Sequence, residues 1–194
     1  MTNSDAILDL YEQGYSKGAI CKALRASPLT VGRVLSEAGL STGDYHKMEP
    51  ELVRVVHALL PHGVFYRDME ACCDVSADAV RDMVARYGYH RDNSYRTYLS
   101  VSEDCLSFPA FPVFVRRYQE GESFPALIQE LGVSDDKIYP LFWYVWSEDL
   151  SGAHREQLAL RAAGLLDQGV PAGAVAHQLH VSPSIVRHVA RSRC

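Results

Sequence analysis

The sequence predicts an all-α protein built from four tandem copies of a small three-helix unit, arranged as two pairs. Three observations predict it: four segments align without gaps, each has a glycine followed thirteen residues later by a serine, and apolar residues recur at helical spacing. The segments are LYEQGYSKGAICKALRASPLTVGRVL, LLPHGVFYRDMEACCDVSADAVRDMV, RYQEGESFPALIQELGVSDDKIYPLF and LLDQGVPAGAVAHQLHVSPSIVRHVA, ending at Leu35, Val84, Phe142 and Ala190.

Each copy is expected to contain one helix stop and one helix cap. Glycine adopts the left-handed conformation that ends a helix, so the glycines are expected to close the first helix. A serine hydroxyl accepts a hydrogen bond from a backbone N–H, so the serines are expected as N-caps of the last helix. Pro28 and Pro183 follow two of them, at the first helical position that tolerates proline. The glycines are Gly14, Gly63, Gly121 and Gly169, and the serines are Ser27, Ser76, Ser134 and Ser182.

Apolar residues are spaced as on helices in all four copies. Between glycine and serine, apolar pairs four residues apart predict a short second helix. After the serine, apolar residues four and seven places on predict a third helix that faces the same small core. The first set is Ile20 and Leu24, Met69 and Cys73, Leu127 and Leu131, and Val175 and Leu179; the second is Val31 and Val34, Val80 and Met83, Ile138 and Leu141, and Val186 and Val189.

A helix, a glycine stop, a second helix of about two turns, a short turn and a capped third helix make a helix-turn-helix unit. The first copy carries this pattern in Gly14-Tyr15-Ser16, Ile20, Leu24, Ser27, Thr30-Val31 and Val34-Leu35. It resembles the C-terminal DNA-binding domain of resolvases and invertases, and is similar to the N-terminal tandem helix-turn-helix modules of transposases. The resemblance covers most of the chain, but four units leave no room for the catalytic domain of either family.

The expected units are residues 1–40, 49–91, 110–149 and 153–194, with a connector at 92–109. The spacing between the serines is 49, then 58, then 48 residues, so the extra length lies in this connector and indicates two pairs of units. Lys and Arg against Asp and Glu count 5 to 5 in residues 1–48, 6 to 10 in 49–104, 3 to 7 in 105–150 and 5 to 2 in 151–194. Phosphate binding is therefore expected mainly from the outer units.

In a helix-turn-helix unit, the third helix enters the major groove and the preceding helix contacts the DNA backbone. Arginine can pair with guanine through two hydrogen bonds, which makes Arg33 and Arg187 the sharpest candidates. By resemblance, the first unit offers Leu29, Thr30 and Arg33 to base edges and Lys17, Lys22 and Arg25 to phosphates, and the fourth offers Ser184, Arg187, His188, Arg191 and Arg193.

The two middle units are expected to contribute less. In the second, Arg81 and Arg86 are well placed for DNA, but Asp78 and Asp82 on the same helix would repel phosphate. In the third, acids at 135 and 136 open the last helix, a proline at 140 lies inside it, and the aromatic run 142–146 requires burial. That unit is expected to pack against a neighbouring unit or a second copy of the chain.

The sequence also predicts what the protein does not do. It has no nucleophile elbow, phosphate loop, HExxH or catalytic carboxylate pair, so we expect no enzyme and no cofactor. His177 and His180 could share a helix face, but no further ligand at metal-site spacing predicts a metal. No apolar run reaches membrane-span length and the start is not basic, which indicates a cytoplasmic protein. Five cysteines without CxxC spacing (Cys21, Cys72, Cys73, Cys105 and Cys194) are expected to be reduced.

Two hypotheses for function remain open. The first is a sequence-specific double-stranded DNA-binding protein, a transcriptional regulator or accessory factor of phage or mobile-element origin. The second is a protein-binding adaptor or inhibitor, built from the same units, that docks a polymerase, nuclease or host regulator. The basic ends favour DNA, and the net charge of −5 favours the adaptor. The expected partners are DNA, a transcription or recombination protein, or a second copy bound through the third unit, and no membrane.

Overall fold

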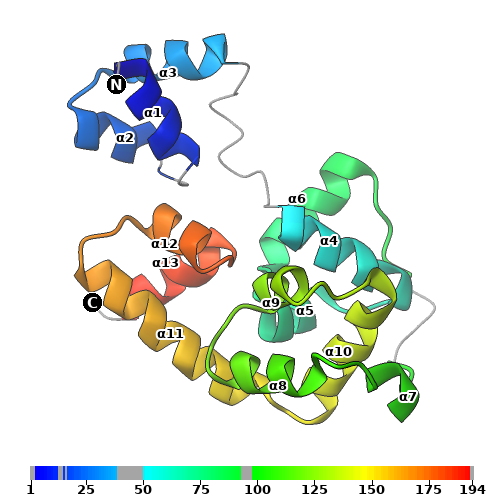
Figure 1. Ribbon diagram of the computed structural model, residues 1–194. Helices are drawn as coiled ribbons and strands as arrows, with labels where there is room; N and C mark the ends of the chain where they lie inside the picture. Colours follow the sequence, from blue (N-terminus) through cyan, green and yellow to red (C-terminus); the bar gives the residue numbers. More distant parts are fainter. Residues whose placement is uncertain (1–2, 13–14, 16, 39–49, 93–97, 193–194) are drawn as a thin grey trace.

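A computed structural model describes residues 3–12, 15, 17–38, 50–92 and 98–192, and within these ranges the chain is helical without strands (Figure 1). The predicted all-α class is confirmed. In chain order the elements are α1 (Asn3–Glu12), α2 (Lys17–Leu24), α3 (Pro28–Glu37), α4 (Pro50–Leu59), the 3₁₀ helix η2 (Leu60–His62), α5 (Tyr66–Cys73), α6 (Ala77–Tyr87), α7 (Glu103–Leu106), α8 (Phe111–Gln119), α9 (Phe124–Glu130), α10 (Asp135–Ser147), α11 (Ser151–Asp167), α12 (Ala172–Gln178) and α13 (Pro183–Arg191). None of the helices in the described ranges has the length and apolar character needed to cross a membrane.

The helices α1, α2 and α3 form an N-terminal group with its own small core. Ile7, Ile20, Val31 and Leu35 are completely buried there, and Val34 nearly so. Each of the three helices packs on the other two. The apolar stripes predicted for the second and third helices of the first segment therefore meet on the same side.

The helices α4 to α10 form a central body around one continuous core. Its packing crosses between segments, because α4 contacts both α9 and α10, and α5 contacts α10. The second and third segments thus share a core, which differs from the expected division of the chain into two pairs at residues 92–109. The physical reason is the burial of α10, six of whose residues are buried and which packs on α4 and α5 of the second segment.

The described part of the connector, residue 92 and residues 98–109, belongs to this central body. The Tyr98 hydroxyl accepts a hydrogen bond from the backbone N–H of Phe65 at 3.0 Å and donates one to Asp68. The Tyr98 ring meets Phe142 and Trp146 edge-on, at centroid distances of 5.3 and 4.8 Å. The connector also contains α7, which packs on α10. It closes one side of the core rather than separating two halves.

The helix α10 fills the middle of the central body, as its aromatic composition predicts. Six of its residues are buried, and Pro140 lies within a helix that continues to Ser147. It packs on α4, α5 and α7, so the expected packing against a neighbouring unit is present within the chain. The structure differs from expectation at Trp146, which is 45% exposed.

The helices α11, α12 and α13 form a C-terminal group with a separate apolar cluster that includes Leu158, Val175 and Val186. The long helix α11 has 17 residues and extends beyond this cluster to contact α8 and α5 of the central body (Figure 1). It therefore joins the C-terminal group to the central body.

The helix stops and caps recur from segment to segment. Gly63, Gly121 and Gly169 are left-handed, as predicted, and Gly14 lies outside the described residues. A second left-handed residue lies two positions before each serine, and the sequence analysis missed it because only one of the four is glycine. These residues are Arg25 (φ 50°), Asp74 (φ 59°), Gly132 (φ 61°) and His180 (φ 52°).

The four serines begin the expected helices but do not all act as caps. Ser27 and Ser76 accept a hydrogen bond from the backbone N–H three residues later, at 3.0 and 3.2 Å. Ser134 and Ser182 occupy the same position without such a bond. The Ser182 hydroxyl is instead bonded to a distant part of the chain, described below.

Candidate nucleic-acid interface

The surface of α2 and α3 carries positive charge and no negative charge over most of its length. Between residues 17 and 36 the sequence contains four Lys and Arg residues and no Asp or Glu. The acidic residues of the N-terminal group lie on α1, apart from Glu37 at the end of α3. This separation of charge gives the group one side suited to phosphate.

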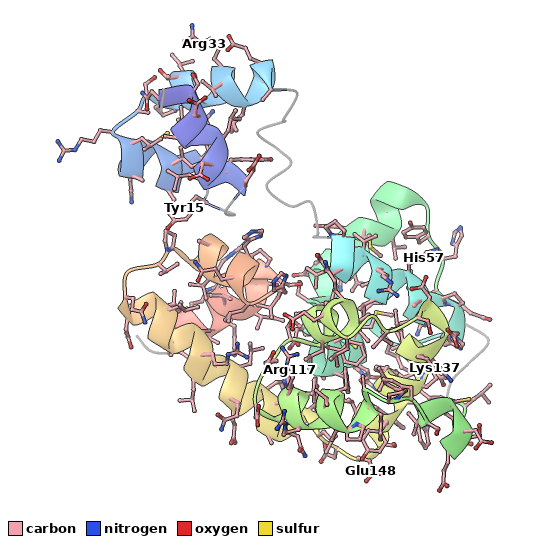
Figure 2. All side chains as sticks on the ribbon, in the orientation of Figure 1. Tyr15, Arg33, His57, Arg117, Lys137 and Glu148 are labelled. Atoms are coloured by element: carbon pink, nitrogen blue, oxygen red, sulfur yellow. The ribbon has the colours of Figure 1, made fainter. Side chains whose placement is uncertain are left out.

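The helix α3 presents an exposed face because its opposite face is fully used in the core. Val31, Val34 and Leu35 point inward, which leaves Leu29 and Arg33 outside. Leu29 is 86% exposed, more than any other large apolar side chain among the described residues. Figure 2 shows Arg33 on the outer side of α3.

The other predicted residues of the first unit surround this face. Lys22 and Arg25 are exposed at the end of α2, and Lys17 at its start is half-buried. Thr30 is partly held, because its hydroxyl lies 2.8 Å from the Ser27 hydroxyl that caps α3. Arg33 lies 3.7 Å from Glu37 with both side chains mostly exposed, and an exposed pair of this kind is worth little.

The helix α6 presents a cation that is already paired. Arg81 forms an ion pair with Asp78 one turn earlier, and both side chains are exposed. Asp82 is exposed beside them, and the Arg86 side chain lies outside the described residues. The two carboxylates that are expected to repel phosphate therefore lie beside Arg81 on the exposed surface of α6.

The helix α13 is placed differently from α3. Its predicted contact residues are one helix face at spacing i, i+3, i+4 and i+7, which we name the α13 contact face: Ser184, Arg187, His188 and Arg191. All four line a groove of about 950 Å³. Arg193 lies outside the described residues.

The opposite walls of this groove come from α5, the start of α6, and α11. They include four carboxylates, Glu70, Asp74, Asp78 and Glu156, as well as Arg67 and Arg155. The Ser184 hydroxyl is buried and has no hydrogen-bond partner among the described residues. Ser184 is half-buried, whereas Arg187, His188 and Arg191 are exposed, so most of the α13 contact face is open to solvent along the groove.

Beneath the groove lies a buried polar cluster centred on Asp74. Its side chain is 1% exposed and its left-handed backbone ends α5. One carboxylate oxygen lies 2.8 Å from Nε2 of His154 on α11, and the other accepts the backbone N–H of Phe124 at 3.0 Å. The backbone carbonyl of Asp74 accepts the N–H of Ser182 at 3.0 Å. One residue therefore joins α5, α9, α11 and the start of α13.

His154 is completely buried and bonded through both ring nitrogens. Its Nδ1 lies 2.8 Å from the carbonyl of Tyr118, which can only accept, so Nδ1 carries a proton. Its ring stacks on that of Tyr118 at a centroid distance of 4.0 Å. Burial by itself lowers the pKa of His154, but the charge and hydrogen bond of Asp74 and the Tyr118 carbonyl outweigh it and raise the pKa above 6.5.

Two backbone turns meet directly at this cluster. The backbone N–H of Ser76 donates to the Ser182 hydroxyl at 2.9 Å, while the N–H of Ser182 bonds the carbonyl of Asp74. Ser76 and Ser182 are the equivalent serines of the second and fourth segments. Sequence reasoning identified both serines as caps but missed Asp74 and His154, because no local pattern marks a pair 80 residues apart.

The described residues contain no cluster of three or more metal-ligating side chains. The rings of His177 and His180 lie 6.5 Å apart without a third ligand. The cysteines at 21, 72, 73 and 105 are free thiols, and Cys194 lies outside the described residues. The candidate sites of this protein are therefore the exposed face of α3, the groove beside α13 and the buried cluster of Asp74 and His154.

No protein-family model matches the chain, and neither a curated protein nor a solved structure matches it.

Proposed function

We propose that this protein is a sequence-specific double-stranded DNA-binding protein made of four tandem helix-turn-helix units, and that α3 is its principal DNA-contacting helix. The observation that carries the proposal is the exposed face of α3, where Leu29 and Arg33 project from a capped helix, and Glu37 at its end is the one carboxylate of residues 17–37. Within this proposal, the protein acts as a transcriptional regulator or accessory factor.

The recurring backbone geometry supports the division into four units. Each proposed unit (residues 1–40, 49–91, 110–149 and 153–194) has a short middle helix that ends in a left-handed residue, followed two positions later by the serine that starts its third helix. This is the arrangement of a helix-turn-helix. The turn between the second and third helices sets the angle between them. This angle determines which face of the third helix points outward.

The chemistry of α3 suits the major groove. Arg33 can donate two hydrogen bonds to guanine, and Leu29 can contact the methyl group of thymine. Lys22 and Arg25 at the end of α2 would lie beside the sugar-phosphate backbone and hold the helix in register. The middle units would then serve as a scaffold, since α10 is buried and the cation of α6 is paired.

One observation favours the second candidate, a protein-binding adaptor. Trp146 is 45% exposed at the end of α10, and Glu148 and Asp149 are exposed immediately after it. An exposed tryptophan with an acidic rim is a surface suited to a basic protein partner. We rank this below DNA binding because it accounts for none of the features of α3.

The test is selection from a random pool of duplex DNA with the purified chain at about 0.1 M salt, where unspecific phosphate binding is weakened. The proposal predicts an enriched motif of a few base pairs, longer if a second unit takes part. If no DNA is retained above background, the DNA proposal is wrong and the adaptor takes its place.

A pair of matched variants then locates the interface. Arg25→Ala with Arg33→Ala is expected to lower affinity for the selected site at least tenfold and to reduce the dependence on salt. Arg116→Ala with Lys137→Ala removes the same charge from α8 and α10 and is expected to leave specific binding within about twofold. Equal effects of the two pairs would mean that α3 has no special role.

A further inference from the structure

We propose that the groove beside α13 is a docking surface for a second copy of this chain, related by a two-fold axis, in which the arginines of each α13 face the carboxylates of the other copy. This surface differs from the third segment, through which the sequence predicted a second copy, because α10 is buried in the central body. The inference goes beyond the proposed function and does not depend on it.

The groove is wide enough to take part of a partner and its lining includes apolar residues. It has a volume of about 950 Å³, with α13 on one side and α5, the start of α6, and α11 on the other. Ala71, Ala159, Ile185 and Val189 line it, and each is only partly buried. Covering such apolar surface is favourable, so these residues can supply the free energy of association.

The α13 wall of the groove carries positive charge without a partner. Arg187 and Arg191 lie one helical turn apart and are exposed along the groove. Neither forms an ion pair with another residue in the described ranges. The chain after Asp167 contains no acidic residue, so α12 and α13 supply no carboxylate to balance them.

The facing wall carries carboxylates without a partner. Two of the four groove carboxylates, Asp74 and Asp78, are already paired within the chain. The other two, Glu70 on α5 and Glu156 on α11, are exposed and make no ion pair within the part of the chain that the structure describes. The two walls therefore offer opposite charges that do not reach each other across the groove.

Two arginines also belong to this facing wall. Arg67 pairs with Asp68 at 3.5 Å, and Nε of Arg155 donates a hydrogen bond to the carbonyl of Ser151 at 3.2 Å. Among the charged groups of this wall that lack an ionic partner in the described ranges, the two carboxylates thus outnumber the single guanidinium of Arg155. The facing wall keeps an excess of negative charge.

The order of the charges selects the occupant. Nucleic acid or an acidic peptide would bring negative charge against Glu70 and Glu156, and a basic peptide would bring positive charge against Arg187 and Arg191. A second copy carries both signs on the same surface. In a two-fold contact each pairing occurs twice, so the α13 arginines of either copy meet the carboxylate wall of the other.

The charges set the partner and its orientation more than the affinity. An exposed ion pair contributes little by itself, so removing one side of it to alanine has a small effect. Reversing a charge instead places like charges opposite each other, which is costly at an interface. Charge reversal is therefore the sharper test of this surface.

The test is sedimentation velocity of the full chain without DNA, between about 1 and 100 μM, where a dimer of micromolar affinity shows a concentration-dependent equilibrium. Wild type is expected to dimerise. Arg187→Glu with Arg191→Glu, and separately Glu70→Arg with Glu156→Arg, are each expected to weaken association at least about tenfold. An equimolar mixture of these two variants should dimerise again, because all the facing charges are then opposite.

The matched control is Arg116→Glu with Lys137→Glu, which makes the same change of charge on α8 and α10. It should leave the dimerisation constant within about twofold. Recovery in the mixture cannot come from misfolded chains, and circular dichroism checks the helix content of each variant. Association that survives both reversals, or a mixture that stays monomeric, would overturn the proposal.

A wild-type chain that stays monomeric over the whole range would also overturn it. If Arg187→Glu with Arg191→Glu then lowers the retention of duplex DNA, the α13 contact face belongs to DNA, as the sequence predicted. Dimerisation is measured without DNA, so its failure leaves the role of α3 to the selection experiment.

Discussion

Replacing Asp74 tests how much the buried cluster contributes to stability. Asp74→Ala removes the partner of His154, and breaking a buried pair in this way costs about 3 to 5 kcal/mol. The residue also has φ of 59°, a conformation that aspartate adopts several-fold more readily than alanine, which adds at most about 1 kcal/mol. The sum, about 3 to 6 kcal/mol, approaches the total stability of an ordinary domain. We expect this variant to be largely unfolded or to lose most of its resistance to urea.

Asp74→Asn is the matched control. Asparagine accepts the left-handed backbone, bonds the N–H of Phe124 and can donate to a neutral His154. The free energy of unfolding of Asp74→Asn should be lower than that of wild type by about 1 to 2 kcal/mol at pH 6, where His154 is charged. The difference should shrink as pH rises through the raised pKa of His154. Below the ordinary value of 6.5 the stabilisation of wild type is complete.

The assay is equilibrium urea unfolding followed by tryptophan fluorescence, since both tryptophans lie on α10 of the central body. Free energies are compared at fixed pH with the same slope against urea. A loss below about 1 kcal/mol for Asp74→Ala, or equal losses for Ala and Asn, would refute the idea that charge and hydrogen bonding at this cluster hold the body together.

Two further substitutions test the packing. Gly121→Ala should destabilise the chain far more than Gly88→Ala, because both glycines have positive φ but the added Cβ would lie 2.6 Å from the backbone of Leu158 at 121 and meet nothing within 4 Å at 88. Thermal unfolding measures the difference, and similar losses would contradict the close approach of α8 to α11. Tyr98→Phe should cost about 1 to 3 kcal/mol, since it leaves the N–H of Phe65 and the carboxylate of Asp68 without the Tyr98 hydroxyl. An unchanged free energy of unfolding in urea would mean that water replaces the Tyr98 hydroxyl as the hydrogen-bond partner.

Much of the local structure could be predicted from the sequence. The start of α3 at Pro28 and the left-handed Gly121 follow from side-chain and backbone preferences that act within a few residues. The burial of Val31 and Val34 follows from helical spacing. Local rules therefore located the helices and the exposed face of α3, including Arg33.

Local rules were weaker where tertiary contacts override a preference. The left-handed Arg25 and His180 have no glycine to mark them, and the Ser182 hydroxyl bonds a distant turn where its position predicted a cap. The connector was expected to separate two pairs of units, yet Tyr98 packs into the core. For the Ser182 hydroxyl and for Tyr98, the deciding partner lies outside the segment.

By itself, the sequence determined the all-α class, the glycine stops and serine starts of the repeated segments, and the excess of positive charge in residues 151–194. Only the tertiary structure decided that α4 to α10 share one core, that Asp74 and His154 pair across 80 residues, and that α13 lines a groove while α3 is exposed. Helix formation depends on neighbours a few residues away, which the sequence shows directly. The pairing of buried charges and the covering of a helix face depend on which distant surfaces meet, and that is decided only when the chain packs.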